Sequence, residues 1–256
     1  MYSDFHVHSD LSFDSNEPAE NQVKRAIELN MEKICFTEHH DIGWYFEGNT
    51  SMIDMDKYNE TISSLRAKYS DQIEILQGIE IGITKENIEE AKAFVEDHDF
   101  DFVIGSFHEL NGEDPYYPGF WDGKSEAEII DDYFNVTYEL LKDFVRVDTL
   151  AHLDYIVRYC PSRDANYNPM VDQKEVIDNI LNLLIERDIC LEINTSNRAK
   201  GFDFAHPHPD ILKRYVELGG KKVTVGSDAH QADKLGYAFD EIKELIDELG
   251  LQVIEK

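Results

Sequence analysis

Seven short apolar runs alternate with amphipathic segments along this chain, and that alternation restricts the folds it can adopt. The runs have the length and composition of buried strands and cover residues 2–7, 33–37, 73–81, 102–107, 147–151, 189–193 and 223–226. A further short run follows at 252–254. Strand–helix alternation predicts parallel strands joined by crossover helices. Seven such units favour an α/β barrel over an open sheet.

The helices between these runs are marked by periodicity and by end signals. The clearest of them cover residues 19–29, 126–144, 172–187 and 239–249. Asp172, with Glu175 three residues later, predicts a capping box at the start of the third helix. Gly250 follows the fourth helix as a C-terminal stop.

Composition limits the class of protein. The 256 residues include 24 basic and 53 acidic side chains, a formal charge of −29, which disfavours nucleic acid polymers and anionic bilayers as partners. No linker or repeat divides the chain, so we expect a single domain over residues 1–256. Neither a membrane-length apolar run of ~18 residues nor a leader pattern is present, which predicts a cytoplasmic protein.

The three cysteines do not form a metal or disulfide pattern. Cys35, Cys160 and Cys190 are odd in number, and no two are separated by only two residues. Cys35 and Cys190 lie within apolar runs, as small core residues do. Any metal would therefore be bound by His, Asp and Glu.

The positions of the histidines indicate such a site. Six of the ten end or closely follow a predicted strand: His6, His8, His39, His108, His152 and His230. In parallel β/α folds those strand ends converge on one face. His6 and His8 are two residues apart, so both can face one ion, although they could also be ordinary polar strand residues.

The next two strand ends add an imidazole and a carboxylate. His39 and His40 are adjacent, so only one of them can point inward, and His40 is the expected loop residue. Glu80 is a lone acid in an apolar strand, which is rare unless it binds a metal or pairs with an inward Arg.

The last strand completes the set. Asp228 and His230 form another i, i+2 pair, which could be a general-base dyad or two metal ligands. Five or more imidazoles with two carboxylates exceed the needs of one four-coordinate ion. The sequence therefore predicts two or three divalent ions, such as Zn, Fe or Mn, in a centre suited to phosphoester hydrolysis.

Loop residues near the strand ends supply further candidates. Asp14 could reach an outer ion or cap a turn. Arg158 and Arg198 could bind a phosphate, or pair with the abundant acids. The loops 41–55 and 109–124 are long and aromatic, which makes them candidates to cover the site. Three histidines are left out of the metal shell, namely His98, His206 and His208.

These motifs resemble the PHP (polymerase and histidinol phosphatase) superfamily. The resemblance rests on Asp4-Phe5-His6-Val7-His8-Ser9, Thr37-Glu38-His39, the Glu80 strand, Ser106-Phe107-His108, His152 and Gly226-Ser227-Asp228-Ala229-His230. It implies a distorted (β/α)7 TIM-like barrel with a trinuclear metal centre. The implied ligands are His6, His8, Asp14, His39, Glu80, His108, His152, Asp228 and His230, and Glu80, Asp228 and His230 are the implied catalytic residues.

The Asp at position 14 resembles the residue found there in the histidinol-phosphatase branch of the superfamily. The resemblance to that branch implies that Arg158 and Arg198 contact phosphate. The resemblance implies hydrolysis of L-histidinol phosphate, a step of histidine biosynthesis, by a metal-bridging hydroxide. Asp154, Glu109 and Glu113 are candidates for binding the cationic groups of that substrate.

Two alternatives stand beside this hypothesis. A PHP-type nucleotide phosphatase or exonuclease would keep the metal centre and change the substrate. A catalytically inactive PHP scaffold that binds a partner protein belongs to another class, and the nine intact candidate ligands argue against it.

Overall fold

A curled parallel sheet forms the centre of the fold. The computed structural model describes residues 3–46, 49–123, 125–144, 146–162 and 168–256. The strands of the main sheet, in spatial order, are β1 (Asp4–Val7), β2 (Lys33–Phe36), β6 (Glu74–Gly82), β7 (Phe102–Ser106), β8 (Thr149–Leu150), β9 (Cys190–Asn194), β10 (Lys222–Gly226) and β11 (Gln252–Val253). The short β3 (His39–His40) also pairs with β6. All of these pairs are parallel, as the strand–helix alternation predicted.

The sheet closes on itself at one end. The backbone N–H of His8 donates to Ala229 O at 3.0 Å, and that of Asp228 donates to His6 O at 2.8 Å. Next to this junction β11 pairs with β10. These contacts join the last strands to the first and confirm the predicted distorted barrel.

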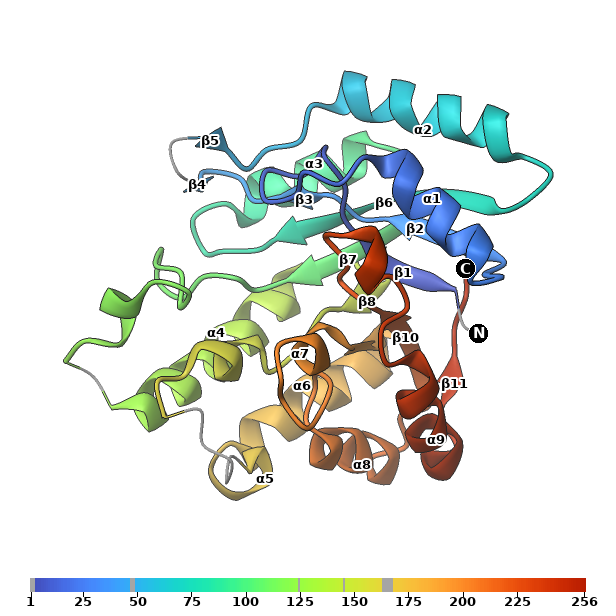
Figure 1. The fold of residues 1–256 in the computed structure, drawn as a ribbon. Helices are drawn as coiled ribbons and strands as arrows, with labels where there is room; N and C mark the ends of the chain where they lie inside the picture. The colour runs from blue at the N-terminus through green and yellow to red at the C-terminus, as the bar shows by residue number, and fades with distance from the viewer. Residues whose placement is uncertain (1–2, 47–48, 124, 145, 163–167) are drawn as a thin grey trace.

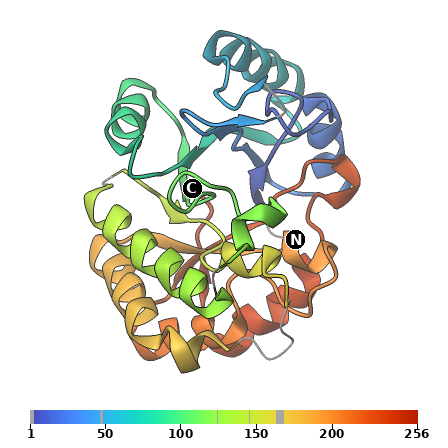
Figure 2. The same ribbon diagram turned by 90° about the vertical axis from the view of Figure 1, so that its left-hand side faces the viewer.

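Helices cover the outside of the strands (Figures 1 and 2). The longer ones are α1 (Ala19–Glu28), α2 (Met55–Tyr69), α3 (Ile88–Asp97), α4 (Glu126–Asp143), α6 (Lys174–Arg187), α8 (Pro209–Glu217) and α9 (Phe239–Leu249). Shorter ones are α5 (Pro169–Asp172), α7 (Ser196–Ala199), and the 3-10 helices Pro118–Trp121, Tyr155–Tyr159 and Ala232–Lys234. In the described part of the chain, no helix has the length and apolarity that crossing a membrane requires.

The two helix-end predictions have different outcomes. Gly250 ends α9 with a φ of +65°, and its N–H donates to Asp247 O, as predicted for a C-terminal glycine. The capping box was wrong, because Asp172 is the last residue of α5. The following helix α6 begins at Lys174 after Gln173, without a side-chain cap.

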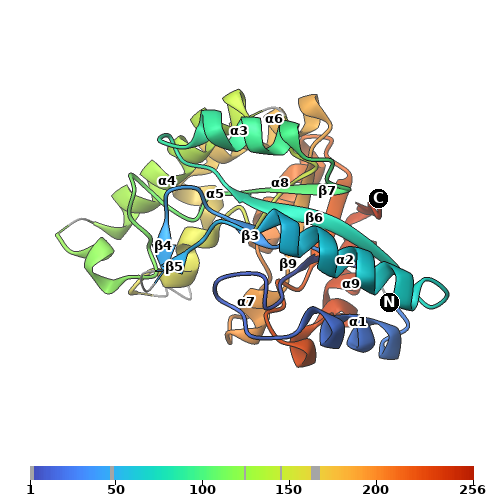
Figure 3. The ribbon, with the colours of Figure 1, turned by 90° about the horizontal axis from the view of Figure 1, so that it is seen from above.

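The long loops lie at the end of the barrel opposite the chain termini (Figure 3). The first contains the antiparallel pair β4 (Tyr45–Phe46) and β5 (Asn49–Thr50), and the second contains the helix Pro118–Trp121. Their residues 47–48 and 124, like Tyr2 at the start of the first predicted strand, lie outside the described residues.

The inner face of the barrel changes from apolar to polar along its strands. Leu76 and Glu80 are four residues apart on β6, so their side chains share one face. Leu76 belongs to a buried apolar cluster with Phe5, Cys35, Phe102, Ile104 and Ala151. The larger core lies between strands and helices and includes Ile79 and Ile81. The apolar cluster therefore fills the barrel on the amino-terminal side of the polar residues, which lie at the carboxyl ends of the strands.

Candidate metal centre

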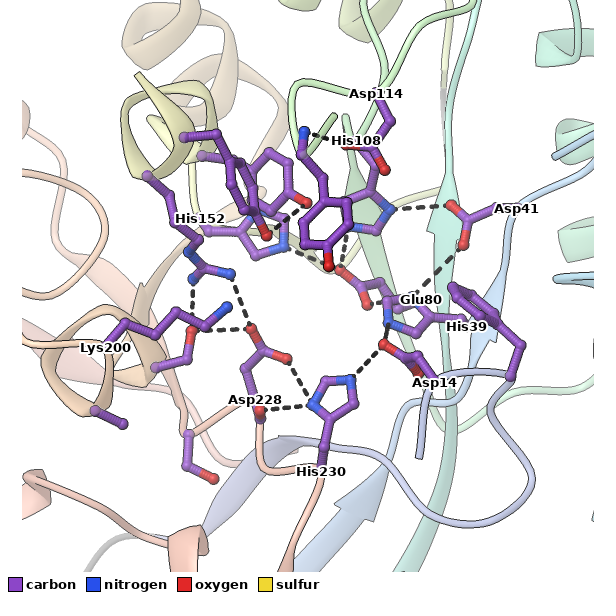
Figure 4. Close-up of a pocket in the computed structure, with 18 of the residues that line it drawn as sticks. Asp14, His39, Asp41, Glu80, His108, Asp114, His152, Lys200, Asp228 and His230 are labelled. Atoms are coloured by element: carbon purple, nitrogen blue, oxygen red, sulfur yellow. Dashed lines mark hydrogen bonds and ion pairs between the residues drawn. The ribbon is translucent and has the colours of Figure 1, made fainter. Parts of the chain in front are cut away.

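A cavity of about 470 Å³ opens where the carboxyl ends of the strands meet, and seven of the nine predicted ligands line it (Figure 4). Trp44 from the first long loop lines it, as do Glu109, Asp114 and Tyr116 from the second. Both long loops therefore contribute residues to the cavity wall, and whether they cover a bound substrate stays a prediction.

Glu80 is the central residue of the cluster. Its carboxylate is fully buried, and imidazoles from four other strand ends surround it. The shortest contacts of Glu80 are His39 Nδ1 at 3.0 Å, His152 Nε2 at 3.1 Å, His6 Nε2 at 3.2 Å and His108 Nε2 at 3.2 Å. Glu80 is not the salt-bridge partner of an inward Arg, because its ion-pair partners among the described residues are all histidines.

Asp228 and Asp14 connect the remaining predicted ligands. Asp228 Oδ1 lies 3.5 Å from both His8 Nε2 and His230 Nδ1. Asp14 Oδ2 lies 2.8 Å from His230 Nε2 and 3.5 Å from His39 Nε2. The structure thus brings all nine predicted ligand residues into one cluster.

The buried atoms of this cluster fit a cation. Polar atoms that are buried without a hydrogen-bond partner are rare in folded proteins. In the described chain, those at this site are His6 Nε2, His8 Nε2, His39 Nδ1, His152 Nδ1 and Glu80 Oε2. Imidazole nitrogens with carboxylate oxygens are the donors that zinc, iron and manganese prefer. The residues present therefore fit a centre of divalent metal ions.

The electrostatics at His8 and Glu80 suit metal binding. Burial, together with the charges of His39 and His230, lowers the pKa of His8 to about 3, so its imidazole is neutral. Burial opposes ionisation of Glu80, but the charges of His6 and His39 hold the pKa of this carboxyl well below its usual range. A neutral imidazole beside an ionised carboxylate is the state in which these groups bind metal.

The backbone of the last strand is shaped for the site. Asp228 has a φ of +54°, a left-handed conformation that is uncommon outside glycine and is often found at functional residues. Two residues earlier, a Cβ on Gly226 would lie only 2.3 Å from His6 Cβ. A glycine is therefore required for His6 to pack at this position.

Sequence reasoning missed three carboxylates near the cluster: Asp41 and Glu192 contact its histidines, and Glu38 is linked to His8 through Ser12. Asp41 Oδ1 lies 3.0 Å from His108 Nδ1, and Asp41 Oδ2 lies 3.6 Å from His39 Nδ1. Glu192 Oε1 lies 2.6 Å from His6 Nδ1. Glu38 accepts hydrogen bonds from Ser9 and Ser12. Glu192 carried a usable signal, because it is a lone acid within a predicted apolar strand, as Glu80 is.

His40 points away from the cluster, as expected for one member of an adjacent pair. Its ring stacks on Phe94 of α3 with a centroid distance of 3.7 Å, and its Nδ1 accepts the N–H of Ile53. His39 is therefore the inward member of the pair.

Arg158 lies at the pocket as predicted. Its side chain is buried, its Nη2 donates to Ser196 Oγ at 2.6 Å, and its Nη1 lies 3.8 Å from Asp228 Oδ2. Lys200 also lines the pocket. Burial and the charge of Arg158 lower the pKa of Lys200 to about 8, although the residue is exposed to solvent by its accessible surface.

The structure corrects the prediction for Arg198. Its Nη2 contacts Glu241 of α9 at 2.5 Å, and its Nη1 donates to Phe202 O, so the guanidinium is not among the groups that line the cavity. Lys200, two residues later, occupies the position that sequence reasoning assigned to Arg198.

The excluded histidines make other contacts. His206 Nδ1 lies 2.5 Å from Asp154 Oδ1, and both side chains are fully buried. Asp154 also accepts the N–H of His208. Because Asp154 does not line the cavity, its predicted role as a substrate-binding acid is wrong. Glu113 is exposed and does not line the cavity, whereas Asp114 does. His98 Nδ1 contacts Phe94 O.

The barrel and its clustered His, Asp and Glu residues define a metal-dependent hydrolase of the PHP type. A PHP domain model matches residues 4–196, and the chain belongs to this family. It is 34% identical to the histidinol-phosphatase of Lactococcus lactis over 96% of this chain and 91% of that protein. It is 33% identical to a "Probable histidinol-phosphatase" of Clostridium acetobutylicum, over 99% of this chain and 96% of the relative.

The fold is also similar to a solved structure. Histidinol phosphate phosphatase from Lactococcus lactis, crystallised with zinc, L-histidinol and phosphate, superimposes with a TM-score of 0.89 at 32% identity. The match covers 99% of this chain and 96% of that one.

Proposed function

We propose that this chain is a histidinol-phosphatase, a phosphoric monoester hydrolase that converts L-histidinol phosphate to L-histidinol and phosphate. The observation that carries the proposal is the single cavity in which the His, Asp and Glu cluster adjoins Arg158 and Lys200. The full-length similarity to histidinol-phosphatases supports the same substrate.

We propose that the whole chain, residues 1–256, forms one phosphoesterase domain. The matched region ends at residue 196, but Asp228 and His230 both come from the loop after the later strand β10. Both lie within 3.5 Å of other members of the cluster. The segment after residue 196 therefore contributes to the same site.

Two or three divalent ions, zinc, iron or manganese, would be bound by the nine clustered residues. Four groups of three donors support more than one ion, and the last of them adds Asp41 to the nine: His8, His39 and His230; His6, His8 and Asp228; His6, Glu80 and His152; His39, Asp41 and His108. When bound, such ions supply Lewis-acid chemistry that activates water and neutralises charge on phosphoryl oxygens.

The protein's own residues would bind and orient the phosphate. Arg158 presents a buried guanidinium beside Asp228, and Lys200 adds a second cation at the cavity wall. A guanidinium can bind two phosphate oxygens at once, which fixes the ester relative to the cluster. During hydrolysis water forms a new P–O bond, the P–O bond to histidinol breaks, and the histidinol oxygen takes a proton.

We propose Glu80, Asp228 and His230 as catalytic residues. Glu80 and Asp228 hold negative charge at fixed positions between several imidazoles. His230 lines the cavity between Asp14 and Asp228, where it faces the reacting ester. These carboxylates would hold the metal ions, whose positive charge stabilises the transition state of phosphoryl transfer.

Two acidic residues of the cavity wall suit the cationic end of histidinol phosphate. Glu109 and Asp114 line the cavity and have no ion-pair partner among the described residues. Burial and the charge of Asp41 raise the pKa of Glu109 to about 7, so a cationic ligand would stabilise its ionised form. The neighbouring rings of Tyr155 and Tyr159, 5.2 Å apart, offer aromatic surface to an imidazole.

We also propose a small-molecule substrate rather than a nucleic acid polymer, and a cytoplasmic location. The charge of −29 supports the first, because it repels a polyanion. The three cysteines are buried and unpaired, which is typical of proteins in reducing compartments.

A substrate screen tests the function. The purified protein is incubated with zinc, manganese or iron, and phosphate release is measured from histidinol phosphate, nucleoside bisphosphates and short oligonucleotides. We expect the highest kcat/KM for histidinol phosphate. Activity confined to the nucleotides would contradict the proposal, as would the absence of bound metal and of any phosphatase activity.

A further inference from the structure

Glu192 of β9 is a buried carboxylate outside the nine predicted ligands. It is 1% exposed, and its Oε1 lies 2.6 Å from Nδ1 of His6, which is fully buried. The pair is therefore a close contact between an acid and an imidazole inside the barrel.

The second oxygen of Glu192 is also occupied. Glu192 Oε2 accepts the backbone N–H of His152 at 2.9 Å and the side-chain amide of Asn194 at 3.2 Å. Gly226 of the neighbouring strand leaves room for the carboxylate, because a Cβ there would lie 2.6 Å from Glu192 Oε1. One side chain thus contacts two of the residues that surround Glu80.

This geometry sets the protonation of the His6 ring. A carboxylate accepts hydrogen bonds, so Nδ1 of His6 must carry the proton in the contact with Glu192. The other nitrogen, Nε2, lies 3.2 Å from Glu80 Oε2 and has no hydrogen-bond partner. The lone pair of neutral His6 therefore faces the cluster.

We infer that Glu192 is a positioning residue of the metal centre: it fixes the tautomer and orientation of His6 and holds the backbone of His152 beside Glu80. The inference rests on the metal centre of the proposed function. Carboxylates that hold metal-binding imidazoles in this way commonly change metal affinity ~10–100-fold when they are replaced.

Metal binding tests this role without reference to activity. Zinc affinity and the number of bound zinc ions per chain are measured for the wild type, Glu192→Gln and Thr224→Val. Thr224 lies opposite Glu192 in the β9–β10 register and forms a buried contact of 2.8 Å with Thr149, so its variant is a matched control. Thermal unfolding of each apo-protein reports the loss of stability.

We expect Glu192→Gln to bind zinc ~10–100-fold more weakly, or to lose an ion, while Thr224→Val binds it as the wild type does. Equal zinc affinity in the wild type and Glu192→Gln would overturn the inference. So would equal loss of zinc in both variants, since that would reflect stability alone. A wild type that binds no zinc would instead overturn the metal centre itself.

A measurement on the wild type covers the case in which Glu192→Gln does not fold. Long-range ¹H–¹⁵N spectra of the zinc-loaded protein, labelled at histidine, report the tautomer of each ring. We expect His6 to carry its proton on Nδ1. A His6 ring protonated on Nε2 would overturn the inference, because Nε2 could then not face a cation.

Discussion

Arg158 donates a 2.6 Å hydrogen bond from Nη2 to Oγ of Ser196, and that hydroxyl lies 2.9 Å from Asp228 Oδ2. The guanidinium is thus held beside the metal-binding cluster by residues of two other segments. The Arg158 guanidinium therefore differs in position from that of Arg198, which contacts Glu241.

The two arginines should therefore differ in their effect on substrate binding. Arg158→Gln removes a buried charged donor, and we expect KM for histidinol phosphate to rise ~10–100-fold while metal content is unchanged. Arg198→Gln is the control and should stay close to the wild type. Steady-state kinetics of both variants measure this. A larger rise in KM for Arg198→Gln than for Arg158→Gln would show that the guanidinium assignments are reversed.

Removal of one imidazole should weaken the whole centre. His8 is fully buried with an unpartnered Nε2, so His8→Ala is expected to bind fewer metal ions and to lose turnover. His40→Ala deletes an imidazole that stacks on Phe94 outside the cluster and should keep its metal. The measurement is the metal content per chain of the two purified variants. A His8→Ala protein with the full metal content of the wild type would be inconsistent with His8 as a ligand.

Asp114 should affect substrate selectivity. If its carboxylate binds the cationic end of histidinol phosphate, Asp114→Asn lowers kcat/KM for that ester by about tenfold and leaves p-nitrophenyl phosphate hydrolysis nearly unchanged. Glu113→Gln changes the adjacent exposed acid and serves as the control. The ratio of kcat/KM for the two esters is the measurement, and an equal loss on both esters would refute a role in selectivity.

Substrate binding should weaken at alkaline pH because of Lys200. Burial and the charge of Arg158 lower its pKa to about 8, so the ammonium group is present below that pH and is lost as pH rises through it. We expect KM for phosphomonoesters to rise as the pH increases through about 8. Lys200→Arg keeps its charge and should show a flatter KM profile. Identical profiles for the two proteins would exclude Lys200 as the titrating group.

Much of the fold and cluster was predictable because strands impose simple rules. The run around Glu80 had the apolar pattern of a buried strand, and its lone acid was identified as a site residue. His6, His108 and His152 followed from the convergence of parallel strand ends. The same rule could have identified Glu192, which lies on the inner face of β9.

The misassignment of Arg198 has a geometric cause. It lies in the four-residue helix α7, and Lys200 follows directly after the end of that helix. The sequence did not specify how this short helix is rotated against the barrel, so Arg198 could not be distinguished from Lys200. Asp41 was missed for a similar reason, because it follows a strand in a loop whose course no periodicity describes.

The most direct test of the account is an anomalous difference map at the zinc edge, from crystals of the zinc-loaded protein. The account predicts at least two peaks within bonding distance of the clustered residues, with Glu80 and Asp228 among their ligands. A map with no peak in this cavity, or with zinc bound only at other surfaces, would contradict it.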